Sequence, residues 1–110
     1  MYSNYHNEKV GKSIMQFSID DLTYSIRLSN HASKRLSQRH IDMYQVMSAI
    51  LALGKDRIKS YSNNQKDIMI HDPVNGFSIV ICIDRCTITI ITCIDKADAY
   101  IKQSTTVYNL

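Results

Sequence analysis

Apolar and polar residues alternate along much of the chain, and this pattern predicts more strand than helix. Two short alternating runs, residues 14–19 and 23–28, flank a pair of aspartates, which favours a β-hairpin with an acidic turn. Residues 1–12 have no periodicity and are rich in Asn, Ser and Lys, so we expect a flexible leader there. Residues 13–110 are then expected to form a single domain.

Apolar spacing becomes helical in the middle of the chain. A Ser-Asn pair is a typical helix start and predicts a short helix from His31 to about His40. A second helix is expected over residues 43–53, where apolar residues recur every three or four positions and Asp42 can cap the first turn. Gly54 follows at a position that favours a left-handed helix end.

The second half returns to strand-like patterns, with many β-branched residues separated by turn residues. The expected elements are strands over residues 57–61, 67–71, 77–84 and 87–94, a short helix over 95–102 and an extended segment over 104–110. The pattern as a whole predicts an α+β fold. Two helices from the N-terminal half would pack on a mostly antiparallel sheet of four to six strands.

The three cysteines do not predict a metal site. A tight turn between the last two long strands would pair Cys82 with Thr89 and place Cys93 opposite Ser78. With Cys86 in the turn itself, no tetrahedral set of four ligands assembles. We therefore expect buried thiols that act as small apolar residues, with no metal and no cofactor.

Composition narrows the class of protein. The 110 residues are 45% hydrophobic and 21% charged, which excludes a disordered or fibrous chain. No apolar run is long enough to cross a membrane, and the polar N-terminus lacks the apolar centre of a secretory signal. Three cysteines without such a signal favour a reducing compartment, so the expected location is cytoplasmic.

Charge is concentrated rather than large. The net charge is +3, but the stretch from Arg27 to Lys59 carries seven basic residues and two acidic ones. That pattern is expected of a surface that faces phosphate groups. The alternative interpretation is a solvated helix face whose Lys and Arg side chains serve solubility.

The first predicted helix carries the most informative spacing. At 100° per residue, His31, Arg35 and Arg39 follow one shoulder of the helix, at the border between core and solvent. Histidine can exchange a proton near neutral pH, and the planar guanidinium of arginine matches phosphate oxygens. These residue types suit cleavage of RNA by its own 2′-hydroxyl without a metal. The alternative is a histidine that caps its helix and two arginines with ordinary surface hydrogen bonds.

A family resemblance follows from this helix and its surroundings. The segment Ile26–Ile41 contains His-Ala, an Arg three residues on and another Arg four further. A capped second helix ending at Gly54 and a late strand, Ile88–Thr92, come next. Over residues 24–94 this layout resembles the RelE/BrnT-like small toxins, within the barnase–EndoU–colicin–RelE group of ribonuclease folds. His40 departs from the pattern, where such proteins commonly have Gly.

The resemblance implies a metal-independent ribonuclease toxin. Its functional positions fall on His31, Arg35 and Arg39, with Thr92 as a further candidate. The partners would be RNA (tRNA or mRNA) and a cognate antitoxin or immunity protein that covers the basic surface.

Further residues are candidates for RNA contacts around that site. Lys34, Arg57 and Lys59 would help to dock the RNA, and Tyr61 could stack on a base. Tyr100 and Tyr108 could stack likewise, with half-buried packing as the alternative for all three tyrosines.

Two other functional classes stay open. A non-catalytic inhibitor or binding protein could use the same fold and act through protein–protein contact. A DNA-binding regulator is the weakest alternative, because no predicted helix has the base-reading side chains of a recognition helix. Outside the helix motif, His71 beside Asp72 could be an oriented base or could make a simple turn hydrogen bond.

Overall fold

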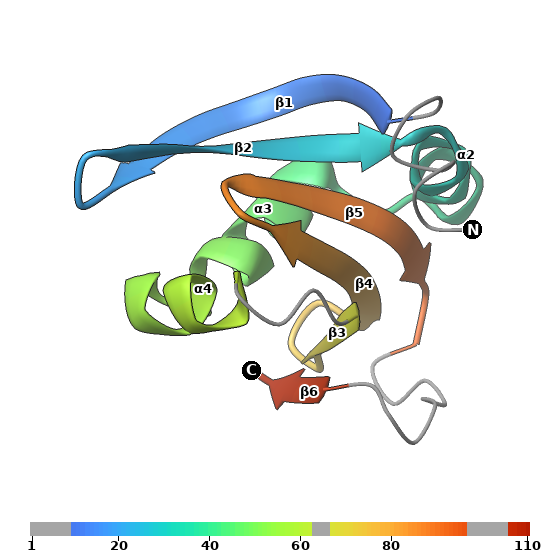
Figure 1. Ribbon diagram of the computed structural model, residues 1–110. Coiled ribbons are helices and arrows are strands. Elements are labelled where there is room, and N and C mark those ends of the chain that lie inside the picture. The colour runs from blue at the N-terminus through green and yellow to red at the C-terminus, as the bar shows by residue number, and fades with distance from the viewer. Residues whose placement is uncertain (1–9, 63–66, 97–105) are drawn as a thin grey trace.

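The computed structural model describes residues 10–62, 67–96 and 106–110 (Figure 1). Within these ranges the chain has the α+β composition that the sequence predicts. It has six strands and three helices, one helix more than the two expected to pack on the sheet. The strands are β1 (Val10–Ile19), β2 (Leu22–Ser29), β3 (Asp67–Asp72), β4 (Phe77–Asp84), β5 (Thr87–Ile94) and β6 (Thr106–Asn109). The helices are α2 (Asn30–Arg39), α3 (Met43–Leu51) and α4 (Lys55–Tyr61).

The six strands form one mixed sheet in the order β1-β2-β5-β4-β3-β6. The β1–β2, β5–β4 and β4–β3 pairs are antiparallel, as expected for strands joined by short turns. The β2–β5 and β3–β6 pairs are parallel and join segments that are distant in the sequence. The predicted class and number of strands are confirmed, and the sheet is more mixed than the local patterns indicate.

The β4–β5 hairpin has the predicted register only near its turn. Cys82 pairs with Thr89, as the tight turn requires. A register shift further along the hairpin then displaces one strand by one residue. Cys93 therefore pairs with Ile79, and the expected pairing of Cys93 with Ser78 is wrong.

Residues 57–61, expected as a strand, are helical and belong to α4. An isolated apolar residue between polar neighbours fits a period of two or of 3.6, and here Ile58 is the one buried residue of the helix. Gly54, with φ of 85°, begins α4 rather than closing α3, which ends instead at Ala52 with ordinary right-handed helical angles. Burial of Ile58 against the sheet decides between the two periods.

The chain ends also differ from the expectation. Strand β1 begins at Val10, so residues 10–12 belong to the sheet and not to a flexible leader. Residues 1–9 lie outside the described residues, as does most of the helix expected over 95–102. The extended segment expected over 104–110 contains β6, which confirms that prediction in its described part.

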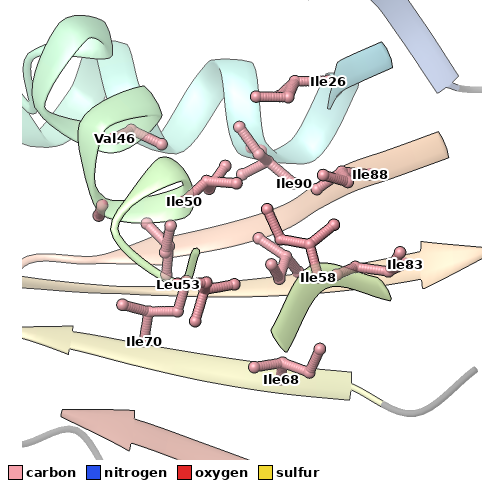
Figure 2. Packing of buried hydrophobic residues seen from close by; sticks show 14 of the residues in the cluster. Ile26, Val46, Ile50, Leu53, Ile58, Ile68, Ile70, Ile83, Ile88 and Ile90 are labelled. Atoms are coloured by element: carbon pink, nitrogen blue, oxygen red, sulfur yellow. The ribbon is translucent and has the colours of Figure 1, made fainter. Parts of the chain in front are cut away.

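Helices α3 and α4 pack on one face of the sheet, and α2 lies beside the end of β2 (Figure 1). Figure 2 shows Ile50 of α3 and Ile58 of α4 pointing toward isoleucines of the strands, among them Ile70 and Ile83. Each of these side chains is at most 2% exposed. Burying one such side chain is worth roughly 1.5–3 kcal/mol, so this layer holds the helices firmly against the sheet.

Candidate functional site

Helix α2 is held against the sheet through its N-cap, Ser29, which is also the last residue of β2. Ser29 is fully buried, and its hydroxyl oxygen accepts from the backbone N–H of Ala32 at 2.9 Å, as a helix N-cap does. The same hydroxyl donates to the carbonyl of Ile91 in β5 at 3.1 Å. These two bonds join the start of α2 to β5, sixty-two residues further along the chain.

Sheet pairing explains why α2 lies beside β5. Strand β2 pairs with β5 only as far as Ile90, and the chain then turns into α2. The buried side of α2, Ala32 and Leu36, packs into the core next to the remaining part of β5. Side chains of α2 thereby reach the backbone and the side chains of residues 91–93. This contact between a helix and a strand edge forms the candidate site.

His31, Thr92 and Arg35 meet at this contact. The Nε2 atom of His31 lies 3.1 Å from the Thr92 hydroxyl and 3.4 Å from Nε of Arg35. The Nε–H group of Arg35 can only donate, so Nε2 of His31 accepts and carries no proton. We therefore assign the ring proton of neutral His31 to Nδ1, with the Thr92 hydroxyl as a second donor to Nε2.

The surroundings of His31 favour its neutral form. Partial burial lowers the pKa of His31 below its usual 6.5, and the nearby positive charges of Arg35, Arg39 and Lys34 lower it further. The imidazole is consequently neutral at neutral pH, and the lone pair of Nε2 is its proton-accepting position. The side chain is exposed, so a substrate in solution can reach it. These are the properties that a general base needs.

Gln38, which is not among the residues predicted from sequence, orients Arg35. Its Oε1 atom accepts from an Nη atom of Arg35 at 3.1 Å. The guanidinium is thus held between Gln38, three residues ahead, and His31, four residues behind. That i, i+3 spacing on a helix is the signal that could have identified Gln38.

Arg39 points to a different place from Arg35. One of its Nη atoms donates to the carbonyl oxygen of Cys93 at 2.7 Å, and the side chain is half-buried. This bond satisfies a carbonyl of β5 and fastens the end of α2 to the strand. Arg39 still adds positive charge near His31, because it contributes to the lowered pKa of His31. The three side chains from one helix shoulder therefore do not converge on a single point.

His40 ends α2 in the left-handed conformation, with φ of 54°. The next backbone N–H, of Ile41, bonds to the carbonyl of Leu36 at 3.1 Å, as in a Schellman motif. Histidine tolerates this conformation less readily than Gly, the residue that the resembled family commonly has here. The departure from the family pattern therefore changes the residue and leaves the helix end intact.

The structure does not bring Arg57, Lys59 or Tyr61 to His31. Arg57 lies over the Tyr108 ring, with its guanidinium carbon 4.7 Å from the ring centre, and Lys59 forms an ion pair with Asp20 at 2.5 Å. Tyr61 is half-buried against the core. These residues lie around α4, on the side of α3 away from α2 in Figure 1. Lys34 is exposed on α2 itself.

His71 belongs to a separate polar bridge. Its Nδ1 atom lies 2.7 Å from the hydroxyl of Ser78, which is fully buried and donates to the carbonyl of Lys96 at 2.5 Å. Asp72 does not orient His71, because its carboxylate accepts from Asn75 in the following turn. The proton of Ser78 is committed to Lys96, so this pair joins strands and is not a nucleophile with its base.

Neither a membrane helix nor a cluster of metal ligands occurs among the described residues. None of their helices has the length and apolar character needed to cross a membrane. In the same part of the chain, no three His, Cys, Asp or Glu side chains gather as metal ligands would. The thiols of Cys82 and Cys93 are buried, and that of Cys86 is half-buried. Tyr100 lies outside the described residues.

The chain matches no protein-family model, and comparison with curated proteins and with solved structures gives no match either. The functional assignment therefore depends on the geometry around His31.

Proposed function

We propose that this protein is a metal-independent ribonuclease of the RelE/BrnT-like type, with its reactive centre at His31. The observation that carries the proposal is the meeting of His31, Arg35 and Thr92 at the edge of β5. A neutral imidazole with an unprotonated Nε2 atom, next to a guanidinium, supplies a base and a phosphate ligand in one place. The substrate would be RNA, of the tRNA or mRNA class.

In the proposed reaction His31 accepts the proton of a ribose 2′-hydroxyl at Nε2. The 2′-oxygen bonds to the adjacent phosphorus and the bond from phosphorus to the 5′-oxygen breaks. The leaving oxygen takes a proton from water, and the hydroxide so formed takes the proton from Nε2 of His31, which restores the neutral imidazole. Arg35 stabilises the negative charge that develops on the phosphate oxygens. The products are a 2′,3′-cyclic phosphate and a 5′-hydroxyl end.

Thr92 and Gln38 would serve as positioning residues. The Thr92 hydroxyl occupies the place from which a substrate hydroxyl would donate to His31, so it keeps the imidazole oriented while the site is empty. Gln38 keeps the guanidinium of Arg35 beside the ring. Lys34 and the charge of Arg39 would attract RNA to this side of the molecule.

The test is cleavage of RNA in the presence of EDTA. We expect cleavage by the wild-type protein to survive chelation and His31→Ala to lower the rate by at least about a hundredfold, the usual range for loss of a general base. His40→Asn is the matched control, since it removes a neighbouring exposed histidine and retains a side chain that tolerates positive φ. An RNA with 2′-deoxyribose at the cleaved position should resist the enzyme. Absence of cleavage in every RNA tested would contradict the proposal.

A second candidate function is favoured by Arg39. Its bond to the Cys93 carbonyl leaves one well-placed guanidinium beside His31 instead of two. A non-catalytic binding protein on the same fold does not need two arginines that converge beside His31. In that case His31→Ala would leave its function intact, whereas charge reversal at Arg35 would abolish partner binding.

A further inference from the structure

Side chains of the protein itself occupy the proton-accepting atom of His31. A neutral imidazole has one lone pair for hydrogen bonding, on its unprotonated nitrogen. Two donors share this lone pair at Nε2, the Thr92 hydroxyl at 3.1 Å and the Nε–H group of Arg35 at 3.4 Å. A substrate hydroxyl must therefore displace at least one of these donors before His31 can accept its proton.

Arg35 is the more easily displaced of the two donors. Its distance of 3.4 Å from Nε2 exceeds the roughly 2.7–3.2 Å of most N–H hydrogen bonds in proteins. The imidazole is a neutral acceptor, and so is the other acceptor of Arg35, the Oε1 atom of Gln38 at 3.1 Å. Among the described residues, no carboxylate pairs with Arg35. The guanidinium consequently has two neutral partners and no counter-charge in this part of the chain.

The charged groups around His31 are all positive. Helix α2 contains no Asp or Glu. Its cations, each of which lowers the pKa of His31, are Arg35, Arg39 and Lys34. From β5 the site receives two neutral groups, the Thr92 hydroxyl and the Cys93 thiol, which keeps its proton because burial raises its pKa to about 12. Positive charge without a neighbouring acid attracts an anion to this site.

A phosphate oxygen is a better acceptor for Arg35 than either of its two partners in the structure. Hydrogen bonds from a guanidinium to an anionic oxygen are about 2.7–2.9 Å long and roughly twice as strong as bonds between neutral groups. One guanidinium can also bind two oxygens of the same phosphate. A phosphate group beside α2 would therefore draw Arg35 away from His31 and leave Nε2 with the Thr92 hydroxyl alone.

We propose that Arg35 shields Nε2 of His31 and that binding of a phosphate group to Arg35 removes this shield. The ligand is a phosphodiester of RNA, and inorganic phosphate is a small group with the same chemistry. The inference rests on the proposed function in taking His31 as the base, and it adds how the substrate makes that base available. In RNA the phosphate lies next to the 2′-hydroxyl, so the group that moves Arg35 arrives together with the hydroxyl that His31 deprotonates.

The test is nitrogen NMR of the imidazole rings in the full chain, labelled with isotope-enriched histidine. Spectra are recorded well above the pKa of His31, so that the ring stays neutral, while inorganic phosphate is added. Sodium chloride at the same ionic strength is the parallel titration. We expect phosphate to move the Nε2 resonance of His31 in the direction that loss of a hydrogen-bond donor gives, and chloride to leave it in place. The ring of His40, exposed at the other end of α2, is the internal reference.

Two variants separate the two donors to Nε2. Arg35→Met keeps the apolar stem and removes the guanidinium, so the Nε2 resonance should be shifted before any phosphate is added. The same variant should bind phosphate at least about tenfold more weakly, the usual loss when a charged hydrogen-bonding group is removed. Thr92→Val is the matched variant, because it removes the other donor and retains Arg35. Its Nε2 resonance should still move with phosphate, and thermal unfolding of both variants checks that the fold is intact.

Two results would overturn the inference. One is an Nε2 resonance of His31 that phosphate does not move, or moves no more than chloride does. The other is an Arg35→Met variant that responds to phosphate as the wild type does. Cleavage of RNA in EDTA is a separate measurement, so the two proposals can fail independently. A protein that cleaves RNA without the phosphate response contradicts the shielding alone, and one that shows the response without cleavage supports the shielding and contradicts the ribonuclease.

Discussion

Replacing Ser29 with Ala should destabilise the protein by about 2–3 kcal/mol. The hydroxyl of Ser29 makes two bonds in a fully buried position, one as N-cap of α2 and one to the carbonyl of Ile91. Loss of an N-cap costs about 1 kcal/mol. The second bond, from the buried hydroxyl to the carbonyl of Ile91 in β5, is lost as well, which adds about 1–2 kcal/mol.

The assay is urea unfolding followed by circular dichroism, with thermal unfolding as a second measurement. A loss of this size lowers the melting temperature of a domain this small by about 8–15 °C. Ser29→Thr is the control, because it keeps a hydroxyl at the same position and should recover much of the stability. If Ser29→Ala changes the free energy of unfolding by less than about 0.5 kcal/mol, the attachment of α2 to β5 is not as described.

Three further predictions follow from other parts of the structure. Ile58→Ala truncates the one buried side chain of α4 and should lower the free energy of unfolding by about 2–5 kcal/mol. Backbone amides of α4 should then lose hydrogen-exchange protection before those of the sheet, and protection in α4 that outlasts the sheet would contradict this. The hydrogen bond and charge of Lys59 lower the pKa of Asp20 below its usual 3.8. The ion pair therefore stabilises the folded protein fully above pH 3.8, and this contribution is lost as the pH falls through the lowered pKa. Asp20→Asn should therefore lower the melting temperature at pH 7 and match the wild type in strong acid. Burial and then Arg35 lower the pKa of His31, so Arg35→Gln should raise the pKa of His31 in an NMR titration; an unchanged value would refute the contact.

Elements whose pattern is local were predictable from sequence. The helix that begins after Ser29 and the β4–β5 turn both depend on residues within a few positions of each other, and both are confirmed. The strand expected over residues 57–61 failed because five residues around one isoleucine fit two periodicities. Which period the chain adopts depends on the surface that Ile58 finds in the folded protein.

The candidate site was predictable only in part, because some of its contacts are local in sequence and others come from distant strands. Helical spacing places His31 and Arg35 one turn apart, and their contact at 3.4 Å follows from that spacing. The same spacing places Arg39 on that side of the helix, but the Cys93 carbonyl takes up its guanidinium. No property of α2 alone indicates this carbonyl, because it comes from a strand fifty-four residues away.

The sequence by itself determined the period of most elements, the cap at Ser29 and the row of basic residues on α2, because these depend on side chains that are neighbours along the chain. Tertiary structure decided that α2 lies beside β5, that Thr92 meets His31 and that the second parallel pair joins β3 to β6. These contacts join segments far apart in sequence. They form because folding selects the arrangement that buries the isoleucine core and still leaves the strand-edge carbonyls with donors.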